Sequence, residues 1–154
     1  ELWVIGTALI VLAIFLYLAE RFSPRNRDIK QLSFLQIQLI GITQALALIP
    51  GCSRSGSTIM GGLLVGLNRE SAARFSFLLG LPAIFGSGLY ELKELIELGI
   101  SSDGYLNLVV GIAAAFVTGY LSIALLLRFL RNHGTLVFVI YRIVLGAGIL
   151  LFLV

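Results

Sequence analysis

The sequence predicts an all-α integral membrane protein with a single transmembrane domain, residues 1–154. Hydrophobic residues make up 58% of the chain and charged residues 12%. The mean hydropathy is +1.02, which is outside the range of soluble globular proteins. A helix needs about 20 apolar residues to cross a bilayer core of ~30 Å. Three segments are long enough, 2–19, 105–127 and 135–153, and a fourth, 70–90, is long enough if its charged first turn lies at the interface.

Polar segments between these spans predict where the helices begin and end. A linker with a proline break, 20–30, follows the first span. Ser33 and Gln36 then have the spacing of a capping box, which starts the next helix. That helix is expected over 34–49, and a shorter one is expected over 57–67.

The following helix is expected to begin just after Asn68, whose side chain is of a type that caps helix N-termini. Pro82 lies inside this helix and predicts a kink or a break, because proline removes one backbone hydrogen bond. Gly62 and Gly66 have the spacing that permits close helix contact, and internal packing is favoured over a dimer face.

The distribution of Lys and Arg predicts that the two short helices form a re-entrant pair, which enters and leaves the membrane on one side. In that arrangement the loops 20–30, 68–74 and 128–133 share one side and hold eight Lys and Arg residues, against one in the loop 91–104. If the pair crossed the membrane instead, the split would be five against four. Because Lys and Arg concentrate on the cytoplasmic side, the re-entrant arrangement is favoured.

The turn between the short helices, Pro50–Thr58, has the composition of an oxyanion site. It carries one arginine and four hydroxyl side chains, and arginine, hydroxyls and free N–H groups bind phosphate in proteins. A charge at membrane depth costs ~2.5–3.5 kcal/mol, so it normally faces a cavity or a partner. A helix restarting near Ser55 would leave the N–H groups of residues 56–58 unpaired. We therefore predict a phosphate site formed by Gly51, Ser53, Arg54, Ser55, Gly56, Ser57 and Thr58.

Other interpretations of these polar residues stay open at this point. The hydroxyls could merely satisfy the broken backbone while Arg54 pairs with a carboxylate, although five polar side chains exceed what capping needs. Arg142 could reach the phosphate cavity or neutralise a carboxylate of a neighbouring helix. Gln44 could touch the site or bond to another helix. Arg74 could contact a lipid phosphate or form an ion pair with Glu70, four residues before it.

Composition also limits the partners of the chain. The net charge is +3, but the basic residues are scattered over short loops, so we expect no nucleic-acid partner. The spans lack a cluster of acidic side chains, so we predict no metal site formed by this chain alone.

The run Gly41–Thr58, with its Pro-Gly-Cys-Ser-Arg-Ser motif, resembles the second signature of the bacterial undecaprenyl-diphosphate phosphatase family, the BacA-type enzymes of bacitracin resistance. The likeness continues through 61–67, 72–79 and 140–142. This resemblance implies a multi-pass hydrolase of the bacterial inner membrane that removes the terminal phosphate of undecaprenyl diphosphate. The product is the lipid carrier of peptidoglycan synthesis. The implied fold has two inverted-topology repeats, each with a re-entrant helix pair, that meet at a central site.

The same resemblance assigns roles to three residues of the turn. Ser53 would be the nucleophile or a phosphate ligand, Arg54 would stabilise charge on the transferring phosphoryl group, and Thr58 would orient the phosphate. The family also implies a divalent cation, Mg or Ca. Its ligands are expected in a Glu-rich N-terminal repeat that this sequence lacks, so the chain would be the C-terminal repeat, inactive alone. A homodimer of two such repeats could also form.

A second function fits the same pattern. Inverted repeats with broken helices facing an anionic substrate are typical of transporters. The alternative is therefore half of a polyprenyl-phosphate flippase or transporter, which would bind the lipid without hydrolysing it.

Overall fold

The computed structural model describes residues 2–97, 99 and 102–153, and these are almost entirely helical, with no strand among them. The prediction of an all-α chain is confirmed. Residues 1 and 154, the ends of the predicted domain, lie outside the described residues. The elements are, in order, α1 (Leu2–Phe22), η1 (Ile29–Gln31), α2 (Phe34–Gln44), η2 (Ala45–Leu48), α3 (Arg54–Leu64), α4 (Arg69–Glu97), α5 (Ser102–Asn132) and α6 (Leu136–Phe152).

Three described helices are long and apolar enough to cross a membrane: α1, α4, and α5 over Gly104–Asn132. In the most apolar 18-residue stretch of each helix, only 33% of the residues in α1, 22% in α4 and 0% in α5 are buried inside the protein. Apolar helices of this length that stay exposed belong in lipid. α6 is a shorter apolar helix of 17 residues within the segment predicted as the last span. The chain is therefore a membrane protein.

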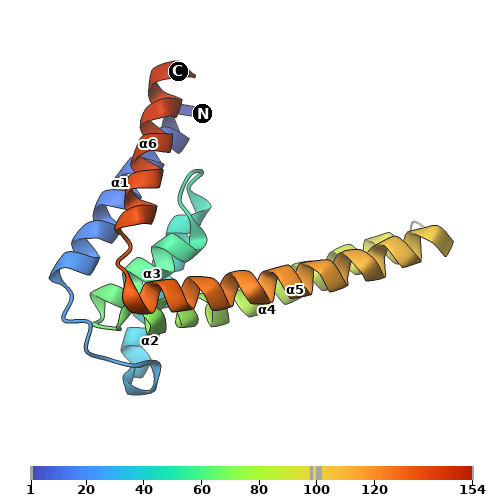
Figure 1. Cartoon of the computed structure of the whole chain (residues 1–154), viewed down its shortest axis with the longest axis horizontal. Helices are drawn as coiled ribbons and strands as arrows, with labels where there is room; N and C mark the ends of the chain where they lie inside the picture. Colours follow the sequence, from blue (N-terminus) through green and yellow to red (C-terminus); the bar gives the residue numbers. More distant parts are fainter. Residues whose placement is uncertain (1, 98, 100–101, 154) are drawn as a thin grey trace.

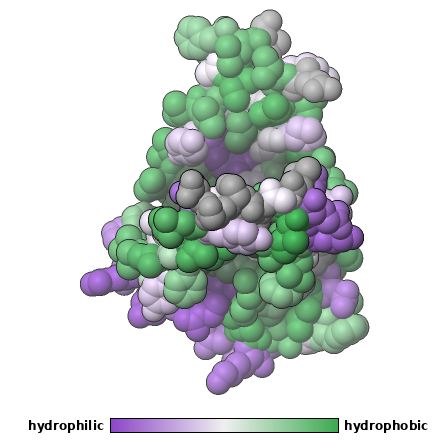
Figure 2. Space-filling model, turned by 90° about the vertical axis from the view of Figure 1, so that its right-hand side faces the viewer, coloured by the Kyte–Doolittle hydropathy of each residue, from purple (hydrophilic) through white to green (hydrophobic). Residues whose placement is uncertain are grey.

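The helices form two antiparallel pairs that diverge from a common base (Figure 1). α1 and α6 lie side by side with the two chain ends close together, and α4 and α5 form a long hairpin that extends away from them. Close contact of α1 with α6 depends on glycine, because a Cβ on Gly146 would lie 2.8 Å from the carbonyl oxygen of Gly6. Figure 2 shows hydrophobic residues over the upper part, where α1 and α6 lie, and hydrophilic residues gathering towards the lower end.

Between the two pairs lies a helical hairpin made of α2, η2 and α3 (Figure 1). Its start is the predicted capping box, because the Ser33 N–H donates to Gln36 Oε1 at 3.0 Å and the Gln36 N–H donates to Ser33 Oγ at 3.3 Å. α3 runs from Arg54 to Leu64, whereas the sequence predicts a helix over 57–67. It starts earlier than predicted because the Ser53 side chain caps it.

The early end of α3 is a glycine C-cap. Gly66 has φ +95°, its N–H bonds to the Leu63 carbonyl at 2.9 Å, and the Leu67 N–H bonds to the Gly62 carbonyl at 3.0 Å. This pair of bonds is the Schellman arrangement, in which glycine takes the left-handed position. The Gly62/Gly66 spacing therefore serves internal structure, since a Cβ on Gly62 would also lie 3.0 Å from Ala72 Cβ in α4.

Helix α4 is longer than the sequence predicts. Asn68 caps it as expected, because its Oδ1 accepts the Ser71 N–H at 2.8 Å. The helix continues through Pro82 without a break. Proline φ fits a helix, and membrane helices tolerate the missing bond because the remaining backbone is bonded internally. α4 extends to Glu97, so much of the segment expected as a loop, 91–104, is helical, and residues 98, 100 and 101 of that loop lie outside the described residues.

The core lies where α1, α2, α3, α4 and α6 meet. It is formed by buried side chains of Leu12, Ala13, Leu16, Ala19, Ile40, Met60, Leu63, Leu67, Ala72 and Val139. Below this core, a buried polar contact joins α1, α4 and α6. Glu20 accepts hydrogen bonds from the Thr135 N–H at 2.8 Å, from the Thr135 hydroxyl, and from Arg69 Nε at 2.5 Å. This carboxylate therefore fixes the common base of the helix pairs.

Candidate functional site

The tip of the hairpin lies against the first turns of α1. Gly51 has φ +91°, a conformation that favours glycine. A Cβ at this position would lie 2.6 Å from the Ile5 carbonyl oxygen. The turn closes with a bond of 3.0 Å from the Cys52 N–H to the Ile49 carbonyl. Glycine therefore allows both the bend and the close approach of the tip to α1.

Ser53 is the N-cap of α3. Its Oγ accepts the Gly56 N–H at 3.1 Å, and its carbonyl accepts the Ser57 N–H at 2.9 Å. The prediction that the N–H groups of residues 56–58 are unpaired is therefore wrong, because the cap moves the helix start to Arg54. The amides ahead of the first intrahelical bond are those of Arg54 and Ser55. Ser53 Oγ also lies 3.2 Å from Ser55 Oγ, so two hydroxyls gather at the helix start.

Arg54 turns towards α4. Its Nη1 donates to the Gly80 carbonyl at 3.5 Å, and a Cβ on Gly80 would lie 2.6 Å from its Nη2. Among the described residues Arg54 has no ion pair with a carboxylate. The alternative interpretation, in which a carboxylate neutralises Arg54, therefore has no support among the described residues. Its single long hydrogen bond leaves most of its donors available.

Ser57 and Thr58 face inwards, with exposed fractions of 0% and 1%. The Ser57 hydroxyl donates to the Ser53 carbonyl at 3.0 Å. Thr58 Oγ1 donates to the Arg54 carbonyl at 3.0 Å and lies 2.6 Å from Ser76 Oγ in α4. Both hydroxyls are therefore engaged in bonds that hold the start of α3 and join it to α4.

Arg142 reaches the hairpin tip from α6. Its Nη2 donates to the Gly51 carbonyl at 3.1 Å, and its Nε is buried with no partner among the described residues. It forms no ion pair in this part of the chain. Of the two possibilities that the sequence left open, the structure places Arg142 at the tip. Its unpaired Nε is a buried donor, and buried donors usually have an acceptor.

A cavity of about 230 Å³ brings some of the predicted residues together with Arg142, whereas Gly51, Arg54, Ser57 and Thr58 do not line it. Its polar end is formed by Ser53, Ser55, Gly56 and Arg142. The rest of its lining is mostly apolar: Leu16, Ile59, Leu126, Leu130, Phe138 and Tyr141, together with Thr135. The cavity thus has hydroxyls and a guanidinium at one end and hydrocarbon walls elsewhere, which suits an amphiphile with an anionic head.

The remaining predicted residues lie elsewhere. Arg74 pairs with Glu70 at 3.3 Å, the ion pair expected from their spacing. Glu70 also receives two bonds of 2.7 Å from Arg131, which the sequence did not suggest because 61 positions separate them. Gln44 Oε1 is buried without a partner among the described residues. Ser76 and Gly80, which contact Thr58 and Arg54, were not predicted as neighbours of the site. No pattern in the sequence around them indicates such contacts.

Acidic and metal-ligating side chains are scattered in the part of the chain that the structure describes. Among the described residues, no three His, Cys, Asp or Glu side chains lie together. Glu20 and Glu70 are engaged by arginines. The arrangement can therefore hold and polarise a phosphate through hydroxyls, N–H groups and guanidinium groups.

Comparison with known proteins gives consistent matches. The family model described as "Bacitracin resistance protein BacA" matches residues 1–148. A curated protein named "Undecaprenyl-diphosphatase" from Thermomicrobium roseum is 50% identical over 143 residues, which are 93% of this chain and 51% of that protein. Proteins of the same name from Nostoc sp. and Syntrophobacter fumaroxidans are 49% and 48% identical over 150 residues, 97% of this chain and 47% and 53% of theirs. The chain therefore spans about half the length of the curated relatives it matches.

Proposed function

This chain belongs to the BacA family, and we propose that it supplies the phosphate-binding half of a hydrolase that converts undecaprenyl diphosphate to undecaprenyl phosphate and phosphate. The observation that carries this proposal is the composition of the cavity at the hairpin tip. Ser53 and Ser55 hydroxyls and the Arg142 guanidinium meet there, above apolar walls. The polar end fits a diphosphate, and the walls fit the first units of a prenyl chain.

Arg54 and Arg142 are the groups that would carry the charge of the reaction. In the hydrolysis, a water oxygen bonds to the terminal phosphorus and gives up a proton, while the bond from that phosphorus to the bridging oxygen breaks. Negative charge therefore grows on the bridging oxygen, which leaves with undecaprenyl phosphate. A guanidinium holds two phosphate oxygens at once and stays protonated. Preorganised cations account for much of the catalysis of phosphoryl transfer. Arg142 lines the cavity and has an unpaired Nε among the described residues. Arg54 does not line the cavity, but its guanidinium has one long bond of 3.5 Å among the described residues, so it could turn to bind phosphate oxygens.

Ser53 is assigned here as a phosphate ligand and helix cap. Among the described residues, the hydrogen-bond partners of its Oγ are the Gly56 N–H and the Ser55 hydroxyl. A serine nucleophile needs an adjacent base, and the described part of the chain offers none at this atom. Ser57 and Thr58 are positioning residues in this proposal, because their hydroxyls are buried and bonded to carbonyls of the preceding turn.

The reaction would also need a membrane and groups that the described part of this chain does not supply. A bacterial inner membrane would hold the prenyl chain around the apolar helices. The base and the ligands of a divalent cation, Mg or Ca, would come from a second repeat outside these residues, because the described residues have no cluster that fits a metal. A homodimer would bring a second phosphate-binding half but the same set of acids.

The test replaces Arg54 with alanine in a complete enzyme, in which this chain substitutes for the matching segment of the Thermomicrobium roseum relative. Removal of one charge-stabilising donor costs about 10²–10³ in rate, so phosphate release from undecaprenyl diphosphate should fall by about that factor. Arg128→Ala, an exposed arginine of α5, is the matched control and should retain activity. Thermal unfolding of both variants should stay near that of the parent.

Near-normal turnover of Arg54→Ala would overturn the assignment of this residue. Sealed vesicles separate hydrolysis from transport, because released phosphate and transferred lipid are measured in the same sample. Lipid transfer without phosphate release would replace the hydrolase with the flippase.

A further inference from the structure

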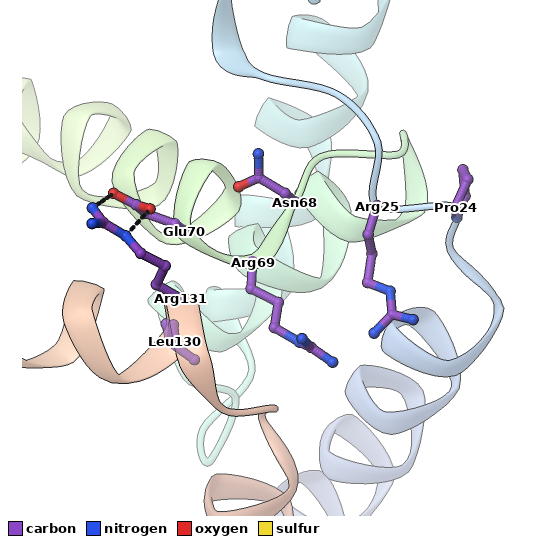
Figure 3. A pocket seen from close by; sticks show the side chains of 7 residues that line it. All are labelled: Pro24, Arg25, Asn68, Arg69, Glu70, Leu130 and Arg131. Carbon is purple, nitrogen blue, oxygen red and sulfur yellow. Dashed lines mark hydrogen bonds and ion pairs between the residues drawn. The ribbon is translucent and has the colours of Figure 1, made fainter.

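A second polar cavity, of about 650 Å³, lies at the base of the helices (Figure 3). Its lining comes from the linker after α1, the start of α4 and the end of α5: Pro24, Arg25, Asn68, Arg69, Glu70, Leu130 and Arg131. Figure 3 shows Arg25 and Arg69 extending from different segments into the same space, whereas Arg131 turns to Glu70. Three of the seven lining residues are therefore arginines that no local sequence pattern groups together.

The walls of this cavity are held by hydrogen bonds. The Arg27 N–H donates to the Gly66 carbonyl at 3.1 Å, and the Asn68 N–H donates to the Arg27 carbonyl at 2.9 Å. Asp28 Oδ1 accepts from Asn68 Nδ2 at 2.7 Å and from the Ser71 hydroxyl at 3.2 Å. The linker is thus attached to the start of α4 by backbone and side-chain bonds, and the cavity does not depend on a loose loop.

The nearby carboxylates do not neutralise the arginines completely. Glu70 pairs with Arg131 at 2.7 Å and with Arg74 at 3.3 Å. Glu20 pairs with Arg69 at 2.5 Å and is 3.9 Å from Arg25. Of these four arginines, Arg74 does not line the cavity. The three that do line it, Arg25, Arg69 and Arg131, pair with two carboxylates, which leaves an excess of one positive charge.

Arg25 is the least neutralised of these cations. Its side chain is 35% exposed, and its only ion pair with a described residue is the long one to Glu20. Its backbone has φ +51°, a conformation that residues other than glycine rarely adopt. The structure therefore holds a charged side chain at the cavity wall in an unusual backbone conformation.

The cavity lies where three apolar helices end. α1 ends at Phe22, α4 begins at Arg69 and α5 ends at Asn132, and the polar ends of apolar membrane helices are where lipid headgroups are met. It is a different cavity from the one at the hairpin tip, although Leu130 belongs to both linings. Its three arginines, Arg25, Arg69 and Arg131, do not line the cavity at the tip.

We propose that this cavity binds the phosphate of an anionic phospholipid headgroup, as a second phosphate site in addition to the one at the hairpin tip. Arginine binds phosphate oxygens through a planar pair of donors, and basic pockets between membrane helices bind anionic headgroups. The N-terminus of α4 opens onto the cavity and adds the positive end of a helix dipole. The headgroup phosphate would bind Arg25 and Arg69 and would face away from the carboxylate of Glu70.

The test measures lipid retained by the full chain in nanodiscs of phosphatidylcholine with a minority of phosphatidylglycerol. Native mass spectrometry counts the phosphatidylglycerol that stays bound after release from the disc. The site variant is Arg25→Gln/Arg69→Gln, and the control is Arg21→Gln/Lys30→Gln, which removes the same charge from exposed residues outside the cavity. Hydrogen bonds to charged groups are stronger than the general attraction of a basic surface. Retention should therefore fall at least about tenfold further in the site variant than in the control.

A second variant guards against misfolding. Arg69→Gln removes the cation paired with Glu20, so Arg25→Gln alone is also measured, with circular dichroism as the check on helicity. Equal losses in site and control variants would overturn the proposal, because they indicate only a diffuse surface potential. No loss in either would also overturn it. In pure phosphatidylcholine discs, inorganic phosphate should bind weakly, and tight binding that Arg25→Gln abolishes would replace the lipid with a soluble anion.

Discussion

Arg54 of α3 and Gly80 of α4 are in direct contact, with Nη1 donating to the Gly80 carbonyl at 3.5 Å. The guanidinium occupies the space that a side chain at position 80 would need, since a Cβ there would lie 2.6 Å from Nη2. The position of the proposed catalytic arginine therefore depends on a glycine 26 residues away.

Gly80→Ala should displace the Arg54 guanidinium and lower phosphate release by about tenfold or more, because small misplacements of a catalytic group have large effects on rate. The measurement is turnover of undecaprenyl diphosphate in the complete enzyme described above. Gly86→Ala is the matched control in the same helix, where an added Cβ meets nothing within 4 Å. Alanine favours a helix over glycine by ~1 kcal/mol, so neither variant should unfold. Equal activity of the two variants would show that this contact does not position Arg54.

Arg142→Lys should weaken binding of a prenyl diphosphate by about tenfold or more. Lysine keeps the charge but loses the planar pair of donors, and hydrogen bonds to charged groups contribute about 1.5–3 kcal/mol. Calorimetric titration of the detergent-solubilised chain with farnesyl diphosphate measures the change. Arg128→Lys, on the exposed surface of α5, should bind as the parent does. An unchanged affinity in Arg142→Lys would remove Arg142 from the site.

Glu20→Ala should destabilise the chain by about 3 kcal/mol, because it leaves the buried Thr135 groups and Arg69 without their acceptor. The free energy of unfolding in mixed detergent reports this loss. Glu97→Ala is the comparison, since Glu97 forms an exposed ion pair with Lys93 at 3.5 Å, and such pairs contribute about 0–1 kcal/mol. Similar losses in both variants would contradict the role of Glu20 at the helix base.

Gly51→Ala should destabilise the hairpin tip by about 1–3 kcal/mol. Left-handed backbone costs roughly 1–2 kcal/mol for residues other than glycine, and the added methyl group would also meet the backbone of Ile5. Gly41→Ala, where nothing lies within 4 Å in α2, should be neutral or slightly stabilising. Thermal unfolding of the two variants gives the comparison. A Gly51→Ala protein as stable as the parent would mean that the tip can move away from α1.

Features that depend on neighbouring residues could be predicted from the sequence. The capping box of Ser33 and Gln36 and the cap at Asn68 lie where the sequence places them, because a cap bonds to amides two or three residues away. The predicted start of the second short helix was less accurate. Ser53 caps α3 with its own side chain, so the helix begins at Arg54 and the amides of Gly56 and Ser57 are paired. That this hairpin enters and leaves the membrane on the same side stays a prediction.

By itself, the sequence determined that this protein is helical, that it resides in a membrane and that a polar Pro-Gly turn interrupts its apolar helices. Hydropathy, capping and turn chemistry act over a few residues, so they can be recognised in the chain. Only the tertiary structure decided that Arg142 meets Gly51, 91 positions away, and that Arg25, Arg69 and Arg131 surround one cavity. Such contacts arise from the packing of whole helices, and the shapes and crossing of those helices are not encoded at any single position.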